Sequence, residues 1–126
     1  MAIRIKRIYT PAEQTDGFRV LVDRLWPRGV SKENARIDLW LRDVAPSSAL
    51  RVWFGHDSKH WTEFRMRYYA ELRKNSKSLA TLVERAKRGT LTLLYSARDE
   101  RFNQAVVLKT YLDKRSLPTP KKTKKK

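Results

Sequence analysis

The sequence predicts a single α/β domain in which a small mixed or parallel sheet of about three strands packs against roughly four or five helices. The run of aliphatic residues at 20–22 is typical of a strand that is buried on both faces. Apolar residues recur at helical spacing over residues 61–72 and again over 79–86. A length of 126 residues suits one domain with one core.

The first two strands are expected in the N-terminal 24 residues. Ile3 and Ile5 alternate with charged residues, so we place a half-exposed strand at residues 3–8. Residues 10–17 are rich in turn formers and fall short of the dozen or so residues that a parallel crossover usually needs. The second strand covers residues 18–24, and it is therefore either antiparallel to the first or not adjacent to it.

Two short helices are expected after the loop that extends from the second strand to residue 31. The spacing of the apolar residues over 37–44 predicts a short amphipathic helix that ends before Pro46. Leu50, Trp53 and Phe54 indicate another helical turn or two, closed by Gly55.

The C-terminal half predicts three longer helices and one more strand. Asp57 is placed to cap the helix whose apolar stripe is formed by residues 61, 64, 68 and 72. The next helix covers residues 79–88 and ends at Gly89. A strand at 91–95, a turn at 96–99 and a helix at 102–112 follow. We expect the strands at 18–24 and 91–95 to lie side by side, parallel and central in the sheet.

Chemistry-bearing side chains follow both of these strands. Open α/β sheets bind ligands at the carboxyl ends of their strands, and the last helix would present its positive N-terminus there. Arginine forks match the oxygens of phosphates and carboxylates, so the sequence predicts an anion-binding cleft. In the alternative structural account, Asp23 pairs with an arginine and Ser96 or Asp99 only caps a helix. The candidate ligand-binding residues are Asp23, Arg24, Trp26, Arg28, His56, Ser96, Arg98 and Asn103.

Several kinds of chemistry are excluded or not predicted. The chain has no cysteine, which excludes disulfides, thiolate nucleophiles and cysteine-based metal sites. No G-x-S-x-G motif surrounds Ser96, so it is not predicted to be a nucleophile. His56 and His60 have the i, i+4 spacing of a metal pair, but Gly55 interrupts the helix there and no third ligand is evident. We therefore predict neither a metal nor a cofactor.

The formal charge of +16 is concentrated in part at the C-terminus. Residues 114–126 carry seven lysines and arginines and no acid. Residues 116–126 are expected to be a flexible tail beyond a domain at 1–115, serving either solubility or sequence-independent contact with nucleic acid. The candidate nucleic-acid residues are Lys121, Lys122, Lys124, Lys125 and Lys126.

Neither a membrane span nor a secretory signal is predicted. No apolar run approaches the roughly 20 residues needed to cross a bilayer. The N-terminus alternates isoleucine with basic residues instead of presenting a basic patch followed by an apolar segment. We therefore expect a cytoplasmic protein that makes no membrane contact, and the patterns carry no prediction of its oligomeric state.

Four segments and one asparagine resemble a known bacterial family over about residues 3–115. They are residues 16–29 (DGFRVLVDRLWPRG), 43–47 (DVAPS), 53–57 (WFGHD) and 91–97 (LTLLYSA), with Asn103. The chain thereby resembles the YeaO-like proteins, which form part of domain of unknown function 488. The resemblance implies a small cytoplasmic α/β domain and brings no catalytic residue with it. Broader relatives often carry a cysteine after the last strand, where this chain has Tyr95 and Ser96.

Three functions remain open from the sequence. The first is binding or turnover of a small phosphorylated or carboxylated ligand in the cleft. The second is a nucleic-acid-binding module that uses the basic surface and tail. The third is a protein-interaction domain without a ligand.

Overall fold

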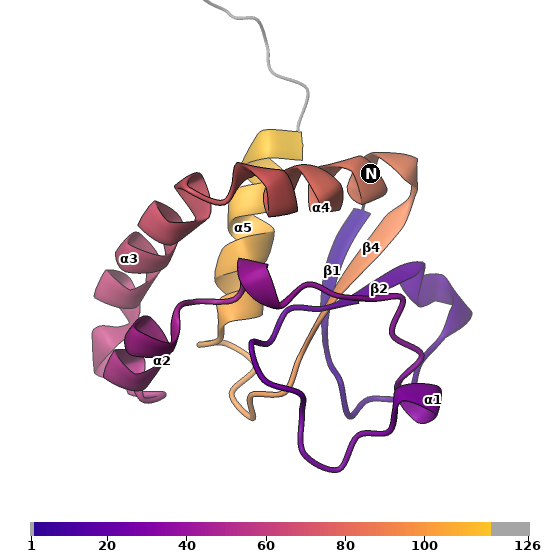
Figure 1. Cartoon of the computed structure of the whole chain (residues 1–126), viewed down its shortest axis with the longest axis horizontal. Helices are drawn as coiled ribbons and strands as arrows, with labels where there is room; N and C mark the ends of the chain where they lie inside the picture. The colour runs from indigo at the N-terminus through magenta and orange to yellow at the C-terminus, as the bar shows by residue number, and fades with distance from the viewer. Residues whose placement is uncertain (1, 117–126) are drawn as a thin grey trace, which may run out of the picture.

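Four parallel strands form one sheet in the order β1–β4–β2–β3. The computed structural model describes residues 2–116, with the side chains of residues 2–114. The strands are β1 (Ala2–Arg7), β2 (Phe18–Leu21), β3 (Leu39–Trp40) and β4 (Thr90–Tyr95). As predicted, β2 and β4 are parallel and central, and β1 is not adjacent to β2 because β4 separates them (Figure 1).

The helices confirm most of the predicted elements. They are α1 (Lys32–Ala35), α2 (Ser48–Phe54), α3 (Trp61–Arg73), α4 (Ser76–Arg88) and α5 (Gln104–Ser116), with short 3₁₀ turns at η1 (Gln14–Asp16), η2 (Arg42–Val44) and η3 (Ser58–His60). Asp57 caps η3, which leads directly into α3, and Gly55 ends α2 with a φ of 54°. The lysine-rich tail that we predict lies outside the described residues except for residue 116.

The prediction of a helix over residues 37–44 is wrong, because this segment forms β3 and η2. Leu39 packs into the helix side of the sheet, whereas Trp40 packs on the opposite side. Such alternation is the mark of a strand. The N–H groups of Asp38 and Leu41 donate to the carbonyls of Arg19 and Leu21, at 2.8 and 3.0 Å, so pairing with β2 satisfies this backbone. The sheet therefore has one strand more than predicted.

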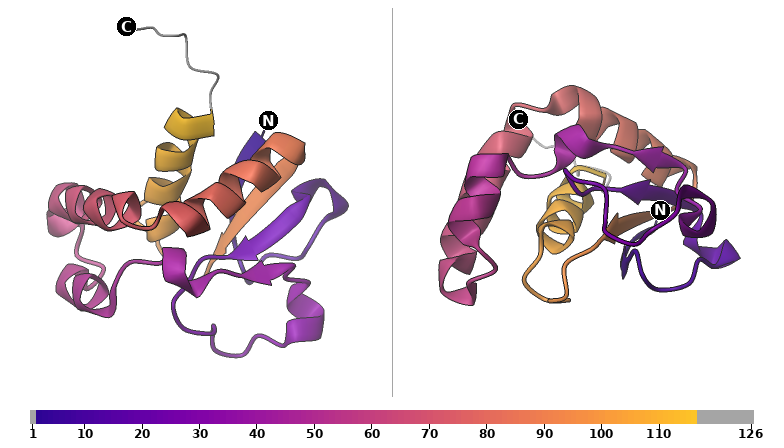
Figure 2. Two further views of the ribbon diagram at one scale, coloured as in Figure 1. Left: turned by 45° about the horizontal axis from the view of Figure 1, so that its top comes forward. Right: turned by 60° about the horizontal axis from the view of Figure 1, so that its bottom comes forward.

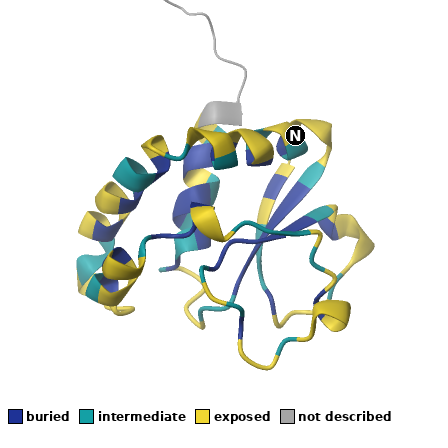
Figure 3. Cartoon of the chain, viewed as in Figure 1, coloured by how far each residue is buried: buried dark blue, intermediate teal, exposed yellow. Residues whose placement is uncertain are grey.

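The core lies on both faces of the sheet. Helices α2 to α5 cover one face, and α1 with the long segment between β2 and β3 lies over the other (Figures 1 and 2). Val20, Leu21 and Val22 are each 0% exposed, which confirms a strand buried on both faces (Figure 3). The strand predicted at 18–24 ends earlier, at Leu21, although the Val22 N–H still donates to the Leu94 carbonyl at 3.0 Å. The loop face is packed by Ile8, Leu21, Ala35, Leu94, Trp26, Val30, Ile37 and Trp40.

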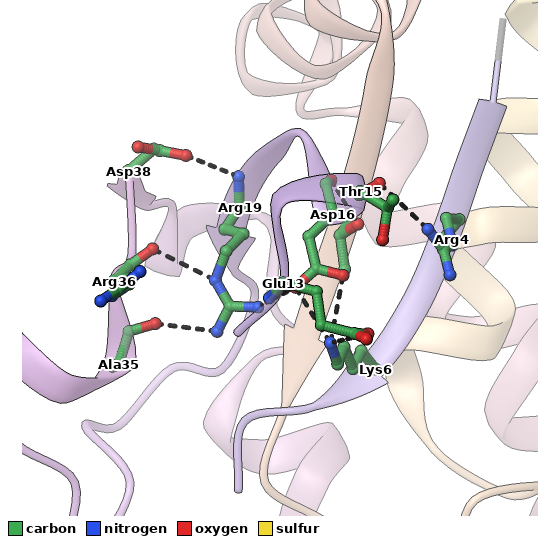
Figure 4. Close-up of polar contacts among 10 residues, drawn as sticks. Arg4, Lys6, Glu13, Thr15, Asp16, Arg19, Ala35, Arg36 and Asp38 are labelled. Carbon is green, nitrogen blue, oxygen red and sulfur yellow. Dashed lines mark hydrogen bonds and ion pairs between the residues drawn. The ribbon is translucent and has the colours of Figure 1, made fainter. Parts of the chain in front are cut away.

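A buried ionic cluster joins β1, η1 and β2 on the loop face of the sheet (Figure 4). The Asp16 carboxylate is fully buried and accepts hydrogen bonds from Lys6 Nζ at 3.0 Å and from Arg19 Nη1 at 2.5 Å. The Glu13 N–H donates to the same carboxylate at 3.0 Å. The Arg19 guanidinium also donates to the carbonyls of Ala35 and Arg36. These hydrogen bonds hold the end of α1 against β2. We call Lys6, Asp16 and Arg19 the Asp16 cluster.

Gly17 lets the chain pass from this cluster into β2. Its φ is 65°, and a Cβ atom there would lie 2.3 Å from the carbonyl oxygen of Thr90. Because neither the dihedral angle nor the space suits a side chain, glycine is required for the connection between β1 and β2 to remain so short.

Candidate functional site

A cleft of about 580 Å³ opens at the carboxyl ends of β2 and β4. Its walls come from the segment after β2, the segment before α2, α2 and the residues just after it, α3, the turn after β4 and the first residue of α5. Five of the eight predicted ligand-binding residues line it: Asp23, Arg24, His56, Ser96 and Arg98. The rule that parallel strands place ligands at their carboxyl ends thus locates the cleft correctly.

Asp23 lies at the base of the cleft and is only 7% exposed. One carboxylate oxygen accepts a hydrogen bond from the Ser96 N–H at 3.1 Å, and the other accepts one from Gln104 Nε2 at 2.6 Å. Asp23 therefore links the end of β2 to the end of β4 and the start of α5. Burial raises the pKa of Asp23 above its usual value, and these hydrogen bonds together with the charge of Arg51 only partly offset that effect.

The raised pKa of Asp23 predicts a pH-dependent difference in stability between the protein and an Asp23→Asn variant. Ionisation of Asp23 is harder in the folded state, so its contribution to stability is present below the unfolded pKa near 3.8 and is lost as pH rises through the folded pKa. Chemical denaturation at several pH values should show that, above about pH 4, the free energy of unfolding of the variant rises relative to that of the wild type. A constant difference across that range would contradict the assignment.

Arg24, Ala45 and Pro46 build one wall of the cleft, and their neighbours Val44 and Ser47 hold that wall in place. The guanidinium of Arg24 donates to the carbonyls of Pro46 and Ala45, at 3.0 and 3.1 Å. The Val44 carbonyl in turn accepts a hydrogen bond from the buried Tyr68 hydroxyl at 2.6 Å. Ser47 caps α2 and is itself held by the carboxylate of Glu71 on α3. Arg24 therefore brings a positive charge to a wall that two elements hold in place.

Three further cationic or titratable side chains reach the cleft from its outer part. Arg51, His56 and Arg98 are exposed, and no ion pair or hydrogen bond joins either arginine side chain to another described residue. His56 follows Gly55 with a φ of 57°, which places it outside α2, as predicted. Its ring lies 6.2 Å from that of Phe54. The cleft is thus lined by three arginines and one histidine, and by a single acid, Asp23.

Trp26, Arg28 and Asn103 do not line this cleft. Trp26 Nε1 donates to the Val30 carbonyl at 2.7 Å, and its ring packs edge-on against Trp40 at 5.3 Å. Arg28 is exposed, and its backbone carbonyl accepts a hydrogen bond from the Tyr9 hydroxyl. Asn103 is buried and caps α5, since its side-chain oxygen accepts a hydrogen bond from the Val106 N–H at 3.1 Å.

The turn before α5 is held by local hydrogen bonds. The Asp99 carboxylate accepts from the N–H groups of Phe102 and Arg101, which lowers the pKa of Asp99 below its usual value. Asp99 therefore holds the turn before α5 and caps no helix, since Asn103 is the residue that caps α5, whereas Ser96 contributes its N–H group to Asp23. The helix-capping role of Ser96 or Asp99 in the structural account is wrong.

Arg51 and Gln104 line the cleft although sequence reasoning missed them. Gln104 is the first residue of the helix expected near residue 102, so its place at the strand ends followed from the predicted topology. Arg51 is an exposed residue of α2, and its sequence neighbours give no sign that this helix borders the cleft. Identifying it required the position of α2 relative to the sheet.

The two histidines contact different aromatic rings. His60 stacks on Trp53 with ring centroids 4.4 Å apart, while His56 lies near Phe54. Within residues 2–116, no three side chains of the histidine, cysteine, aspartate or glutamate types come together as a metal site would require. In the same part of the chain, no helix has the length and apolar character needed to cross a membrane.

The fold and the cleft define a small parallel α/β domain with a cationic cleft at its strand ends. The chain belongs to the inactive DUF488-N3 subclade, whose family model matches residues 2–125. It is 45% identical to Uncharacterized protein YeaO of Escherichia coli (strain K12) over 112 residues, which cover 89% of this chain and 97% of YeaO. It is also 39% identical over 113 residues to Uncharacterized protein Mb3100c of Mycobacterium bovis, covering 90% of this chain and 95% of that protein. No solved structure matches the chain. The resemblance to YeaO-like proteins is thereby confirmed.

Proposed function

We propose that this protein binds a small phosphorylated or carboxylated ligand in the cleft at the ends of β2 and β4. The observation that carries the proposal is the charge of the lining, which has three arginines and one histidine but only one acid. That acid, Asp23, is buried and already accepts two hydrogen bonds. The charge that the cleft presents to a ligand is therefore positive.

The arrangement suits an anion held by Arg51 and Arg98 and oriented by the fixed wall. Guanidinium groups form paired hydrogen bonds with phosphate and carboxylate oxygens. Arg24 is committed to the carbonyls of Pro46 and Ala45, so it supplies charge without moving. Arg51 and Arg98 have no such partner among the described residues and can turn toward a ligand.

Binding is favoured over turnover by the chemistry of the lining and by the family. The described residues of the cleft offer neither a cysteine nor a serine activated by a neighbouring histidine, because Ser96 donates its N–H group to Asp23 and makes no hydrogen bond with His56. The description of the family as an inactive subclade points the same way. We therefore assign the cleft a ligand-binding role.

The binding proposal is tested by calorimetric titration of the full chain with inorganic phosphate, ribose 5-phosphate and succinate at constant ionic strength. We expect saturable binding of ribose 5-phosphate with a dissociation constant below about 1 mM, since two or three charge-assisted contacts would supply roughly 4 kcal/mol or more. Ribose serves as the uncharged control. If none of the three anions saturates the protein at about 10 mM, the proposal is contradicted.

Nucleic-acid binding is the alternative, and it rests on the charge of +16 and the lysine-rich tail. This reading predicts an affinity for short RNA or DNA that falls by orders of magnitude between about 50 and 200 mM salt. Binding of a small anion in one cleft depends on salt far less steeply, because few counterions are released. Titrations at two salt concentrations therefore distinguish the two functions.

A further inference from the structure

The cleft is more apolar than an anion alone requires. Six of its lining residues are apolar, and they come from the segment after β2, the segment before α2, α2, α3 and the turn after β4: Leu25, Ala45, Pro46, Phe54, Phe64 and Ala97. Phe54 and Phe64 stack on each other with centroids 4.3 Å apart and are 5% and 2% exposed, so they form a rigid apolar base. A bare phosphate would leave the exposed apolar part of the lining, which includes Leu25, in contact with water.

Leu25 is the most exposed apolar side chain of the cleft lining. Its side chain is 62% exposed although it lines the cleft, and it follows directly after Arg24, whose guanidinium is fixed. A single exposed leucine is ordinary on a protein surface, but Leu25 lies in the lining of a cleft that has five further apolar residues. A planar ring bound in the cleft would cover the Leu25 side chain.

The size of the cleft agrees with a ligand that has two parts. Its volume of about 580 Å³ lies within the range of sites for drug-sized molecules, roughly 300–1,000 Å³. Polar groups also line the cleft: Gln104 donates through Nε2 to Asp23, and its side-chain carbonyl oxygen accepts no hydrogen bond within the described residues. An N–H group on the edge of a heterocyclic ring could donate to that oxygen.

We infer that the anion bound in the cleft carries an aromatic heterocycle, which makes the ligand an aromatic phosphate of nucleotide size. The ring contacts Leu25 and the apolar base, and the phosphate binds Arg51 and Arg98. This inference rests on the proposed function, because it specifies what is attached to the anion that the arginines hold.

The inference is tested by titrating the full chain with AMP, UMP, ribose 5-phosphate and inorganic phosphate at one ionic strength. We expect at least one nucleotide to bind about tenfold more tightly than ribose 5-phosphate, which lacks the ring. Leu25→Ser should lower the affinity for that nucleotide about fivefold and change the affinity for ribose 5-phosphate less than twofold. Leu25 is exposed, so this substitution removes no core contact.

Val52→Ser is the matched control, because Val52 is 74% exposed on α2 and does not line the cleft. It should leave every affinity unchanged. Two results would overturn the inference while the proposed function stands. Ribose 5-phosphate could bind as tightly as both nucleotides, or Leu25→Ser could lower the affinity for nucleotides and for ribose 5-phosphate equally. If neither the nucleotides nor the two ringless phosphates bind, this inference fails, and if succinate does not bind either, the proposed function fails with it.

Discussion

Replacing Arg51 and Arg98 together by glutamine is expected to lower the affinity for ribose 5-phosphate by at least about thirtyfold. Each arginine can make a charge-assisted contact worth about 1.5–3 kcal/mol, and neither side chain makes an ion pair with an acid among the described residues. Both residues are exposed, so the substitutions should leave the free energy of unfolding within about 0.5 kcal/mol of the wild type. Calorimetric titration measures the affinity, and chemical denaturation measures the stability.

The control for this variant is a double substitution of the same charge outside the cleft. Arg65 on α3 and Lys77 on α4 are exposed and do not line the cleft. Arg65→Gln with Lys77→Gln removes the same two positive charges and should change the affinity by no more than about threefold, because long-range charge is screened by salt. Equal losses in the two double variants would mean that net charge, and not the cleft, attracts the anion.

Asp16→Asn is expected to lower the free energy of unfolding by about 3 kcal/mol. The substitution leaves the buried Arg19 guanidinium and the nearly buried Lys6 ammonium without their shared carboxylate (Figure 4). Breaking a buried ion pair on one side is costly because the remaining charge has lost both water and its partner. Urea denaturation near pH 7 measures the change. Glu84→Gln, which breaks the exposed pair of Glu84 with Arg88 on α4, should cost less than about 1 kcal/mol.

The Asp16 cluster also predicts the direction of acid unfolding. Burial alone would raise the pKa of Asp16, but hydrogen bonds from the Glu13 N–H, Lys6 and Arg19 outweigh it and hold that pKa below its usual value. The stability that Asp16 contributes is therefore present above the unfolded pKa near 3.8 and is lost as pH falls through the folded pKa. The stability gap between wild type and Asp16→Asn should shrink below about pH 4. A gap that widened in acid would contradict this role.

Asp23 and Asp16 show how position in the fold sets opposite pKa shifts for the same side chain. Asp23 has polar but uncharged groups at its two oxygens, so burial dominates and raises its pKa. Asp16 faces two cations, which favour the ionised carboxylate. The sequence motif at residues 16–29 contains both aspartates, yet only their surroundings distinguish them.

The central strands and the longer helices could be predicted because their apolar patterns reflect burial directly. The run at residues 20–22 is buried on both faces, and residues 64, 68 and 72 form the buried stripe of α3. The strand β3 could not be predicted, since two residues are too few to show a period. The apolar residues around it match helical spacing by chance, while pairing with β2 decides the structure.

The position of the cleft was predictable, but part of its lining was not. Asp23 and Ser96 follow two parallel neighbouring strands, so their meeting is a consequence of topology. Trp26 lies only three residues after Asp23, but the chain turns there and the indole packs on Trp40 instead. Likewise, Lys6 on β1 and Arg19 on β2 both reach Asp16 although β4 lies between the two strands, and no local pattern reveals this strand order.

The most direct test of the anion-binding cleft is a titration of the full chain with ribose 5-phosphate at constant ionic strength. The measured quantity is the chemical shift of each backbone amide. The account predicts saturable shifts that share one dissociation constant and centre on residues 23–25, 51–56, 96–98 and 104, which line the cleft or adjoin its lining. Shifts that spread over the exposed basic faces of α3 and α4 and disappear with added salt, with the amides around the cleft unmoved, would contradict it.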